Sequence, residues 1–173
     1  MRIDKLTSKL QSALADAQSM ALVKEHNLID SAHLMLALID QKGGSVRPLL
    51  SQTGFNVAEL HRRLTKAVDD LPQVPDNEGE ISVSPDLAII LNQADKVALQ
   101  KGDSFISSET ILLVAMNNKG AVGKILNGFG VSSQALENAI VNLRGGENVT
   151  DASAEAVSYT HLRGHETDSY LVC

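Results

Sequence analysis

The 173-residue chain is poor in the residues that mark secreted, membrane or nucleic-acid-binding proteins. Its only cysteine is Cys173, so no disulfide can form within the chain, as in proteins of reducing compartments. No stretch approaches the roughly 18 uninterrupted apolar residues of a membrane span. Trp is absent, only three Phe and two Tyr occur, and the net charge is −6, which leaves neither base-stacking surfaces nor a basic stripe. These absences predict a cytoplasmic protein that binds neither membranes nor nucleic acid.

Apolar residues recur every three or four positions along most of the chain, which is the pattern of amphipathic helices. Asp4 and either Asp30 or Ser31 stand where helices could be capped, and Asn56 with Glu59 has the spacing of a capping box. In the first part of the chain these signals predict four helices, over residues 4–24, 32–40, 46–53 and 57–71.

A proline-rich stretch interrupts this pattern near the middle of the sequence. The segment PQVPDNEGEISVSP begins at Pro72 and holds three of the four prolines, so we expect a connector over residues 72–84. Ser84 followed by Pro85 then has the form of a helix cap with proline at the first helical position. Four more helices are predicted after it, over residues 85–101, 109–118, 121–127 and 133–143.

The two sets of four helices match each other residue by residue. Ile29 corresponds to Ile106 and Leu36 to Leu113, a shift of 77 positions that becomes 76 after one deletion. Two copies are too few for an open solenoid, which favours a closed arrangement. The sequence therefore predicts an all-α fold in which two pseudo-twofold-related four-helix repeats, 4–71 and 85–146, pack as one compact bundle. This domain covers residues 1–147, and residues 148–173 are expected to form a disordered tail.

Five stretches of the sequence carry a resemblance to a known family: MRIDKLTSKLQSALADAQSMAL, GGSVRPLL, LPQV, GDSFISSE and LRGGENV. Together they resemble the N-terminal domain of the Clp AAA+ chaperones, most closely that of the protein disaggregases. The resemblance runs from residue 1 to about residue 156 and implies a duplicated, all-helical domain at the front of a hexameric, ATP-driven machine. Its implied partners are unfolded or aggregated proteins and the rest of that hexamer. Residues 157–173 do not continue the family pattern and are expected to be foreign to it.

The sequence offers no catalytic or nucleotide-binding constellation. GAVGKI has a Gly-Lys pair but lacks the spacing and the hydroxyl residue of a phosphate-binding loop, so ATP and Mg are expected to bind ATPase domains missing from this chain. His161 and His165 are four apart but are not expected to hold a metal, and His33 is expected to serve the start of a helix. We therefore expect a non-catalytic binding module without cofactor or metal. One alternative stays open, an adaptor-binding domain of a Clp unfoldase that feeds a protease.

The resemblance implicates three polar residues in the handling of substrates, namely Thr7, Asp103 and Glu109. Carboxylates beside a helix N-terminus are favoured by the helix dipole, and exposed ones select partners of positive charge. The helix over 109–118 is apolar nearly all round, and this excess is expected to line a groove between the repeats. The other residues expected to line it are Ile90 and Val97, together with two positions at which the family carries leucine, Gln93 and Thr110. Such a groove would prefer polar or basic segments.

Overall fold

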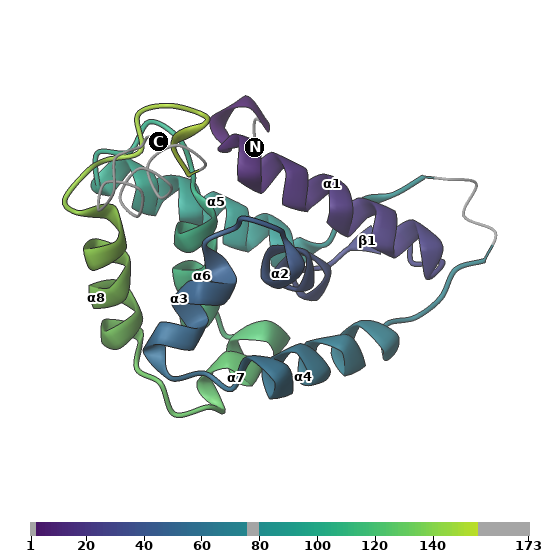
Figure 1. The fold of residues 1–173 in the computed structure, drawn as a ribbon. Helices are drawn as coiled ribbons and strands as arrows, with labels where there is room; N and C mark the ends of the chain where they lie inside the picture. Colours follow the sequence, from purple (N-terminus) through teal and green to yellow (C-terminus); the bar gives the residue numbers. More distant parts are fainter. Residues whose placement is uncertain (1–2, 76–79, 156–173) are drawn as a thin grey trace.

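A computed structural model describes residues 3–75 and 80–155, and within these ranges the fold is all-α (Figure 1). A 3₁₀-helix, Ile3–Lys5, precedes the first α-helix. The α-helices of the described residues are α1 (Ser8–Val23), α2 (Ser31–Asp40), α3 (Val46–Thr53), α4 (Val57–Asp69), α5 (Pro85–Gln100), α6 (Ser108–Asn117), α7 (Ala121–Asn127) and α8 (Ser133–Arg144). Each helix predicted from the sequence is present, so the predicted fold class is confirmed.

Local capping signals explain where the helices begin. Asp30 caps α2, and its carboxylate accepts a hydrogen bond from the backbone N–H of Ala32 at 3.1 Å. The start of α1 differs from the expectation, because the 3₁₀-helix forms a separate turn and Asp4 lies within it. Thr7 is the N-cap instead, and its Oγ1 accepts from the N–H of Leu10 at 3.3 Å.

Two short parallel pairings reveal the pseudo-twofold relation between the repeats. The strands β1 (Leu28–Ile29) and β2 (Ser82–Val83) pair with Ile29 opposite Val83, and Leu6 forms an isolated parallel bridge with Ile106. A shift of 77 residues converts Leu6 into Val83 and Ile29 into Ile106, so each pair becomes the other when the repeats are exchanged. The duplication seen in the sequence is therefore a spatial symmetry as well, although the strands themselves were not predicted.

The helices α2 and α6 form the centre of the core. In Figure 1, α2 is seen nearly end on, with α1 above it and α4 below it. All residues of α6 from Ser108 to Met116 are buried, because α3, α5, α7 and α8 pack around this helix. The expectation that the apolar excess of α6 lines an exposed groove is therefore wrong. A helix that is apolar on all sides is one that other helices surround.

The end of the described chain packs against the domain. Val149 and Glu155 are 4% and 2% exposed, and the carbonyl oxygen of Ala152 accepts a hydrogen bond from the N–H of Ser8 at 2.7 Å. In Figure 1 this last segment, drawn in yellow, lies beside the start of α1. The expectation of a disordered tail is therefore wrong for residues 148–155. Residues 157–173, which include His161 and His165, lie outside the described residues.

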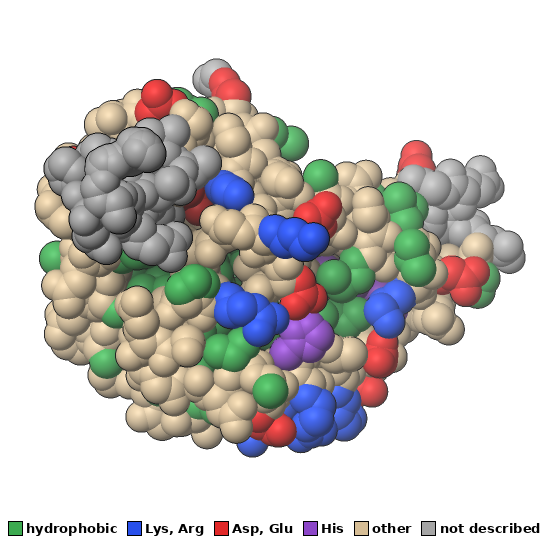
Figure 2. All heavy atoms as spheres, viewed as in Figure 1, with side chains coloured by type: hydrophobic (Ala, Val, Ile, Leu, Met, Phe, Trp, Pro, Cys, Tyr) green, Lys and Arg blue, Asp and Glu red, His purple; other side chains and the backbone are tan. Residues whose placement is uncertain are grey.

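One face of the molecule carries interspersed charges of both signs. On the face shown in Figure 2, Lys and Arg side chains lie among Asp and Glu side chains rather than in one basic patch. No helix in residues 3–75 and 80–155 is long and apolar enough to cross a membrane.

Candidate functional site

The structure brings Thr7, Asp103 and Glu109 together, as expected, but beneath the surface. Thr7 and Glu109 are fully buried and Asp103 is 6% exposed. They belong to a polar cluster that also contains Arg144 and Glu155, which the sequence analysis did not single out. The expectation of exposed carboxylates is therefore wrong, because two segments from the end of the domain cover them.

Arg144 is the cation of the polar cluster. It is the last residue of α8, and its guanidinium donates to Asp103 Oδ2 at 2.9 Å and to Glu109 Oε1 at 3.0 Å. A third donor reaches the hydroxyl of Ser107 at 2.9 Å. Burial lowers the pKa of Arg144, but the charges of Glu109 and Asp103 outweigh burial and leave that pKa raised. One arginine thus pairs with two carboxyl groups inside the protein.

One feature of the sequence could have drawn attention to Arg144. It lies in the stretch LRGGENV, which contributed to the resemblance, at the position where a helix ends before Gly145 and Gly146. A basic residue in the last turn of a helix normally serves the helix dipole, so this residue type gave no reason to expect a buried ion pair.

Glu155 closes the polar cluster from the other side. Its Oε2 accepts hydrogen bonds from Thr7 Oγ1 and from the backbone N–H of Ser108, the latter at 3.1 Å. Burial and the charge of Glu109 raise the pKa of Glu155 to about 7, and the hydrogen bonds from Thr7 and Ser108 partly oppose this rise. Its other oxygen, Oε1, and Ser108 Oγ are buried without a partner of normal hydrogen-bond geometry among the described residues.

The residues expected to line a groove along α5 and α6 separate into two groups. Ile90 and Thr110 are 1% and 2% exposed, so neither can line an open groove, and the Thr110 hydroxyl bonds to Ser107. Gln93 is exposed and Val97 is half-buried.

An exposed apolar residue of α5 lies next to Ile90. Ile89 is 50% exposed, and it lies four residues before Gln93 and eight before Val97, so these three share one side of the helix. We call Ile89, Gln93 and Val97 the α5 stripe. The periodicity of the sequence indicated Ile90 in place of Ile89, whereas Gln93 and Val97 both lie on the stripe.

A second buried polar group lies at the start of α2. His33 Nδ1 accepts from the N–H of Asp30 at 2.8 Å, and its Nε2 lies 2.9 Å from Nδ1 of His26. Neutral His33 therefore carries its proton on Nε2, and this N–H donates a hydrogen bond to Nδ1 of His26. Burial, together with the neighbouring His26, lowers the pKa of His33 to about 4, and burial also lowers that of His26. His33 serves the helix start, as predicted.

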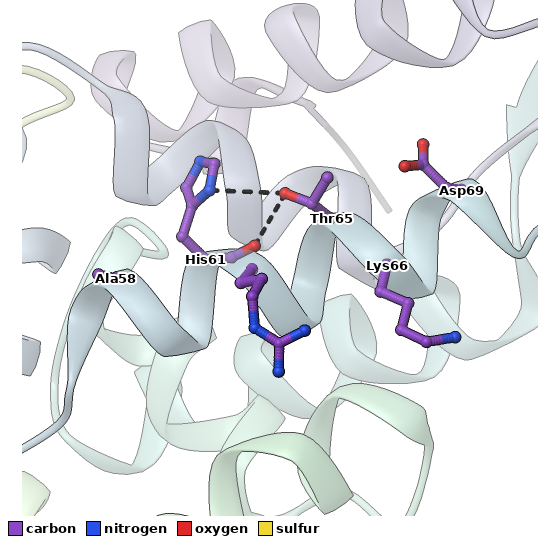
Figure 3. Close-up of a pocket in the computed structure, with 6 residues that line it drawn as sticks. Ala58, His61, Thr65, Lys66 and Asp69 are labelled. Atoms are coloured by element: carbon purple, nitrogen blue, oxygen red, sulfur yellow. Dashed lines mark hydrogen bonds between the residues drawn. The ribbon is translucent and has the colours of Figure 1, made fainter.

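One hollow on the surface lies beside α4 (Figure 3). The hydroxyl of Thr65 donates to the carbonyl oxygen of His61 at 2.8 Å, a bond within the helix. Because all its lining residues come from α4, the hollow brings no distant groups together. The lining residues are Ala58, His61, Arg62, Thr65, Lys66 and Asp69. In the part of the chain that the structure describes, no group of three or more His, Cys, Asp or Glu residues could hold a metal ion.

Comparison with known proteins gives consistent matches. The sequence model of the Clp repeat (R) N-terminal domain matches residues 5–129. The chain is 54% identical over 155 residues to the chaperone protein ClpB of Pseudomonas putida and 43% identical over the same length to that of Vibrio cholerae. These matches cover 90% of this chain and 18% of each relative, so the chain spans about a fifth of their length.

Solved structures share the fold at lower sequence identity. The N-terminal domain of Hsp104 from Candida albicans superposes with a TM-score of 0.75 at 19% identity, over 87% of this chain and 99% of that domain. A complex of the ClpV N-domain with a VipB peptide gives a TM-score of 0.66 at 20% identity, over 90% of this chain and 91% of that one.

Proposed function

Because the chain belongs to the Clp repeat N-terminal domain family, we propose that it is the substrate-binding N-terminal module of a cytoplasmic, ATP-dependent protein disaggregase. The identity of 54% with a ClpB chaperone is the observation that carries this proposal. The module binds unfolded or aggregated polypeptides without catalysing a reaction. ATP and Mg bind elsewhere in the longer, hexameric protein of which it forms a part.

The α5 stripe is the surface that we propose for the first contact with an unfolded chain. Gln93 and Val97 are the accessible remainder of the predicted groove, and Ile89 and Val97 offer apolar area on either side of Gln93. A fully buried apolar side chain contributes about 1.5–3 kcal/mol before the costs of association. Two partly covered side chains therefore support weak, reversible capture, which suits a module that passes its substrate on.

Casein, a protein without stable tertiary structure, provides the test. Titrated into the ¹⁵N-labelled chain, it should shift the amide resonances of α5, and Ile89→Ser should weaken the binding by about five-fold or more, the effect of about 1 kcal/mol of lost contact. The matched control is Val141→Ser on α8, since Val141 is 56% exposed and apolar but lies outside the stripe. Unchanged resonances throughout α5 would contradict the proposal.

The adaptor-binding alternative keeps one observation in its favour. The ClpV N-domain, which shares this fold, has been solved in complex with a peptide of a particular partner, VipB. A domain dedicated to one adaptor would leave its spectrum unchanged with casein and would respond only to that adaptor.

A further inference from the structure

The segment from Val149 to Glu155 lies on the domain as a bound peptide would, and we call it the strap. At one end, the carbonyl oxygen of Val149 accepts from the N–H of Ser104 at 2.7 Å, and its side chain is buried. In the middle, Ala152 accepts from Ser8. At the other end lies the carboxyl group of Glu155, six residues after Val149.

The Glu155 carboxyl group occupies a cradle formed by the N-termini of two helices. Thr7 Oγ1 at the start of α1 and the N–H of Ser108 at the start of α6 both donate to it. The N–H of Ser8 completes the cradle by holding the strap backbone. Three donors from two helix N-termini therefore converge on one acceptor segment, an arrangement that suits the oxygens of a carboxyl group.

The pseudo-twofold axis provides an independent comparison. The positions equivalent to Thr7, Ser8 and Ser108 are Ser84, Pro85 and Ser31. There too a carboxylate is bound, because Ser31 Oγ donates to Asp86 Oδ2 at 2.6 Å. That carboxylate belongs to α5 itself, and Pro85 has no N–H to hold a strap. The cradle at Ser31 is thus filled by a carboxylate of the helix that starts beside it. The cradle at Thr7 is filled by the carboxyl group of Glu155, which lies 148 residues away along the chain.

The strap satisfies its cradle incompletely. Glu155 Oε1 and Ser108 Oγ are buried without a hydrogen-bond partner of normal geometry among the described residues, and the charge of Glu109 opposes ionisation of Glu155. The poor hydrogen-bond geometry of these two groups and the repulsion from Glu109 both weaken the hold of the cradle on the strap. A segment from another polypeptide can therefore compete with it.

We propose that the cradle is a peptide-binding site for acidic segments of client polypeptides and that the strap is its resident occupant, which such a segment displaces. The inference rests on the proposed function, and it reverses the preference for basic segments expected from the sequence. A suitable segment carries an apolar residue six positions before a carboxylate, as Val149 and Glu155 do.

The test uses the full chain and a fluorescent peptide with the sequence of residues 146–156, GENVTDASAEA. The double variant Val149→Ser/Glu155→Ala releases the strap and should tighten binding of this peptide by about ten-fold or more over the wild-type chain. A peptide with Ala in place of the Glu that corresponds to Glu155 should bind about ten-fold more weakly, because it lacks the acceptor for Thr7 and Ser108. The matched control is Glu147→Gln, which removes an exposed carboxylate just before the strap and should bind like the wild type. Equal affinities for all three chains would overturn the proposal.

Hydrogen exchange of the unaltered chain gives a second measurement that does not depend on the variants folding. The amides of Ser8, Ser104 and Ser108 donate to the strap, so they should exchange faster than the amide of Leu38 in the core, and added peptide should slow them. If the amides of Ser8, Ser104 and Ser108 exchange as slowly as the slowest amides of the core, the strap does not open on its own. That result would also overturn the proposal.

The two proposals can fail separately. Peptide binding in the cradle without any response to casein would leave the peptide site standing and remove the role in disaggregation. A casein response in α5 without peptide binding would do the reverse.

Discussion

At the scale of single residues, the structure depends on the ionic pairing of Arg144. Its guanidinium lies between Asp103 and Glu109, whose side chains are completely buried. Apolar replacement of all three groups is often neutral for stability, but removal of the arginine alone leaves two carboxyl groups buried without their counter-ion. The triad therefore fixes the end of α8 against the start of α6 more than it adds to net stability.

We predict that Arg144→Met lowers the free energy of unfolding by roughly 3–5 kcal/mol, because two carboxylates are left buried with their main counter-ion removed. Urea denaturation followed by circular dichroism measures this change. Arg144→Lys should recover only part of the loss, since a lysine cannot reproduce the forked contacts with both carboxylates.

The control for this prediction is Arg62→Met. Arg62 pairs with Glu59 on the exposed side of α4, where water screens the charges, so the urea midpoint should hardly move. Equal shifts for Arg62→Met and Arg144→Met would contradict the role assigned to the buried triad.

At the scale of secondary structure elements, the start of α2 depends on neutral histidine. His33 caps the helix through an unprotonated Nδ1, and Nδ1 of His26 accepts a hydrogen bond from its Nε2–H. Asp30, Lys24 and His26 all act on this pair, and burial is the largest influence on it. Protonation of His33 would break the hydrogen bond from Asp30 and place a charge in the core.

We predict that the domain loses stability in acid through His33. Its pKa of about 4 in the folded state lies below the ordinary value of 6.5, so the unfolded state binds more protons between these two values. The free energy of unfolding should therefore fall as the pH drops from 6.5 towards 4, by at most about 1.4 kcal/mol per pH unit for this group. The stability conferred by neutral His33 is fully present above pH 6.5.

The variant His33→Thr isolates this effect, since Thr110 occupies the equivalent position of the second repeat. Urea denaturation at pH 7 and at pH 5 should give a smaller difference for the variant than for the wild-type chain. Glu155 acts in the opposite direction in both proteins, because its raised pKa favours the folded state in acid, so the comparison cancels it. An identical pH dependence in both would contradict the prediction.

At the scale of the whole molecule, the two repeats complete each other. The helices α3 and α4 of the first repeat pack against α8 and α7 of the second, and β1 pairs with β2. The bridge from Leu6 to Ile106 fastens the first helix of one repeat to the other repeat in the same way. Neither repeat therefore has a closed core of its own.

We predict that fragments 1–75 and 80–173 do not fold separately but fold when mixed. Each fragment alone exposes the apolar faces that the other repeat covers, so circular dichroism should reveal no cooperative thermal unfolding. An equimolar mixture should regain helical signal and a cooperative transition. A cooperative transition in fragment 1–75 alone would show that one repeat is an independent domain.

Much of this fold was determined by the sequence alone, because its signals are local. Caps such as Asp30 and Asn56 and the apolar period fixed all eight described helices to within a few residues. The duplication was visible because equivalent residues kept the same spacing, from Ile29 and Ile106 onwards. The accessible α5 stripe was missed by one residue, since Ile89 and Ile90 are both apolar and only the packing of neighbours distinguishes them.

Only the tertiary structure decided which polar groups are buried and which side chains contact them. Arg144 lies 41 residues from Asp103, and Glu155 lies 148 residues from Thr7, so no local period could reveal these pairs. A carboxylate at a helix start has the same sequence signature whether it faces water or an arginine. Burial depends on which distant segments cover a position, and here the end of α8 and the strap turn an expected surface site into an interior one.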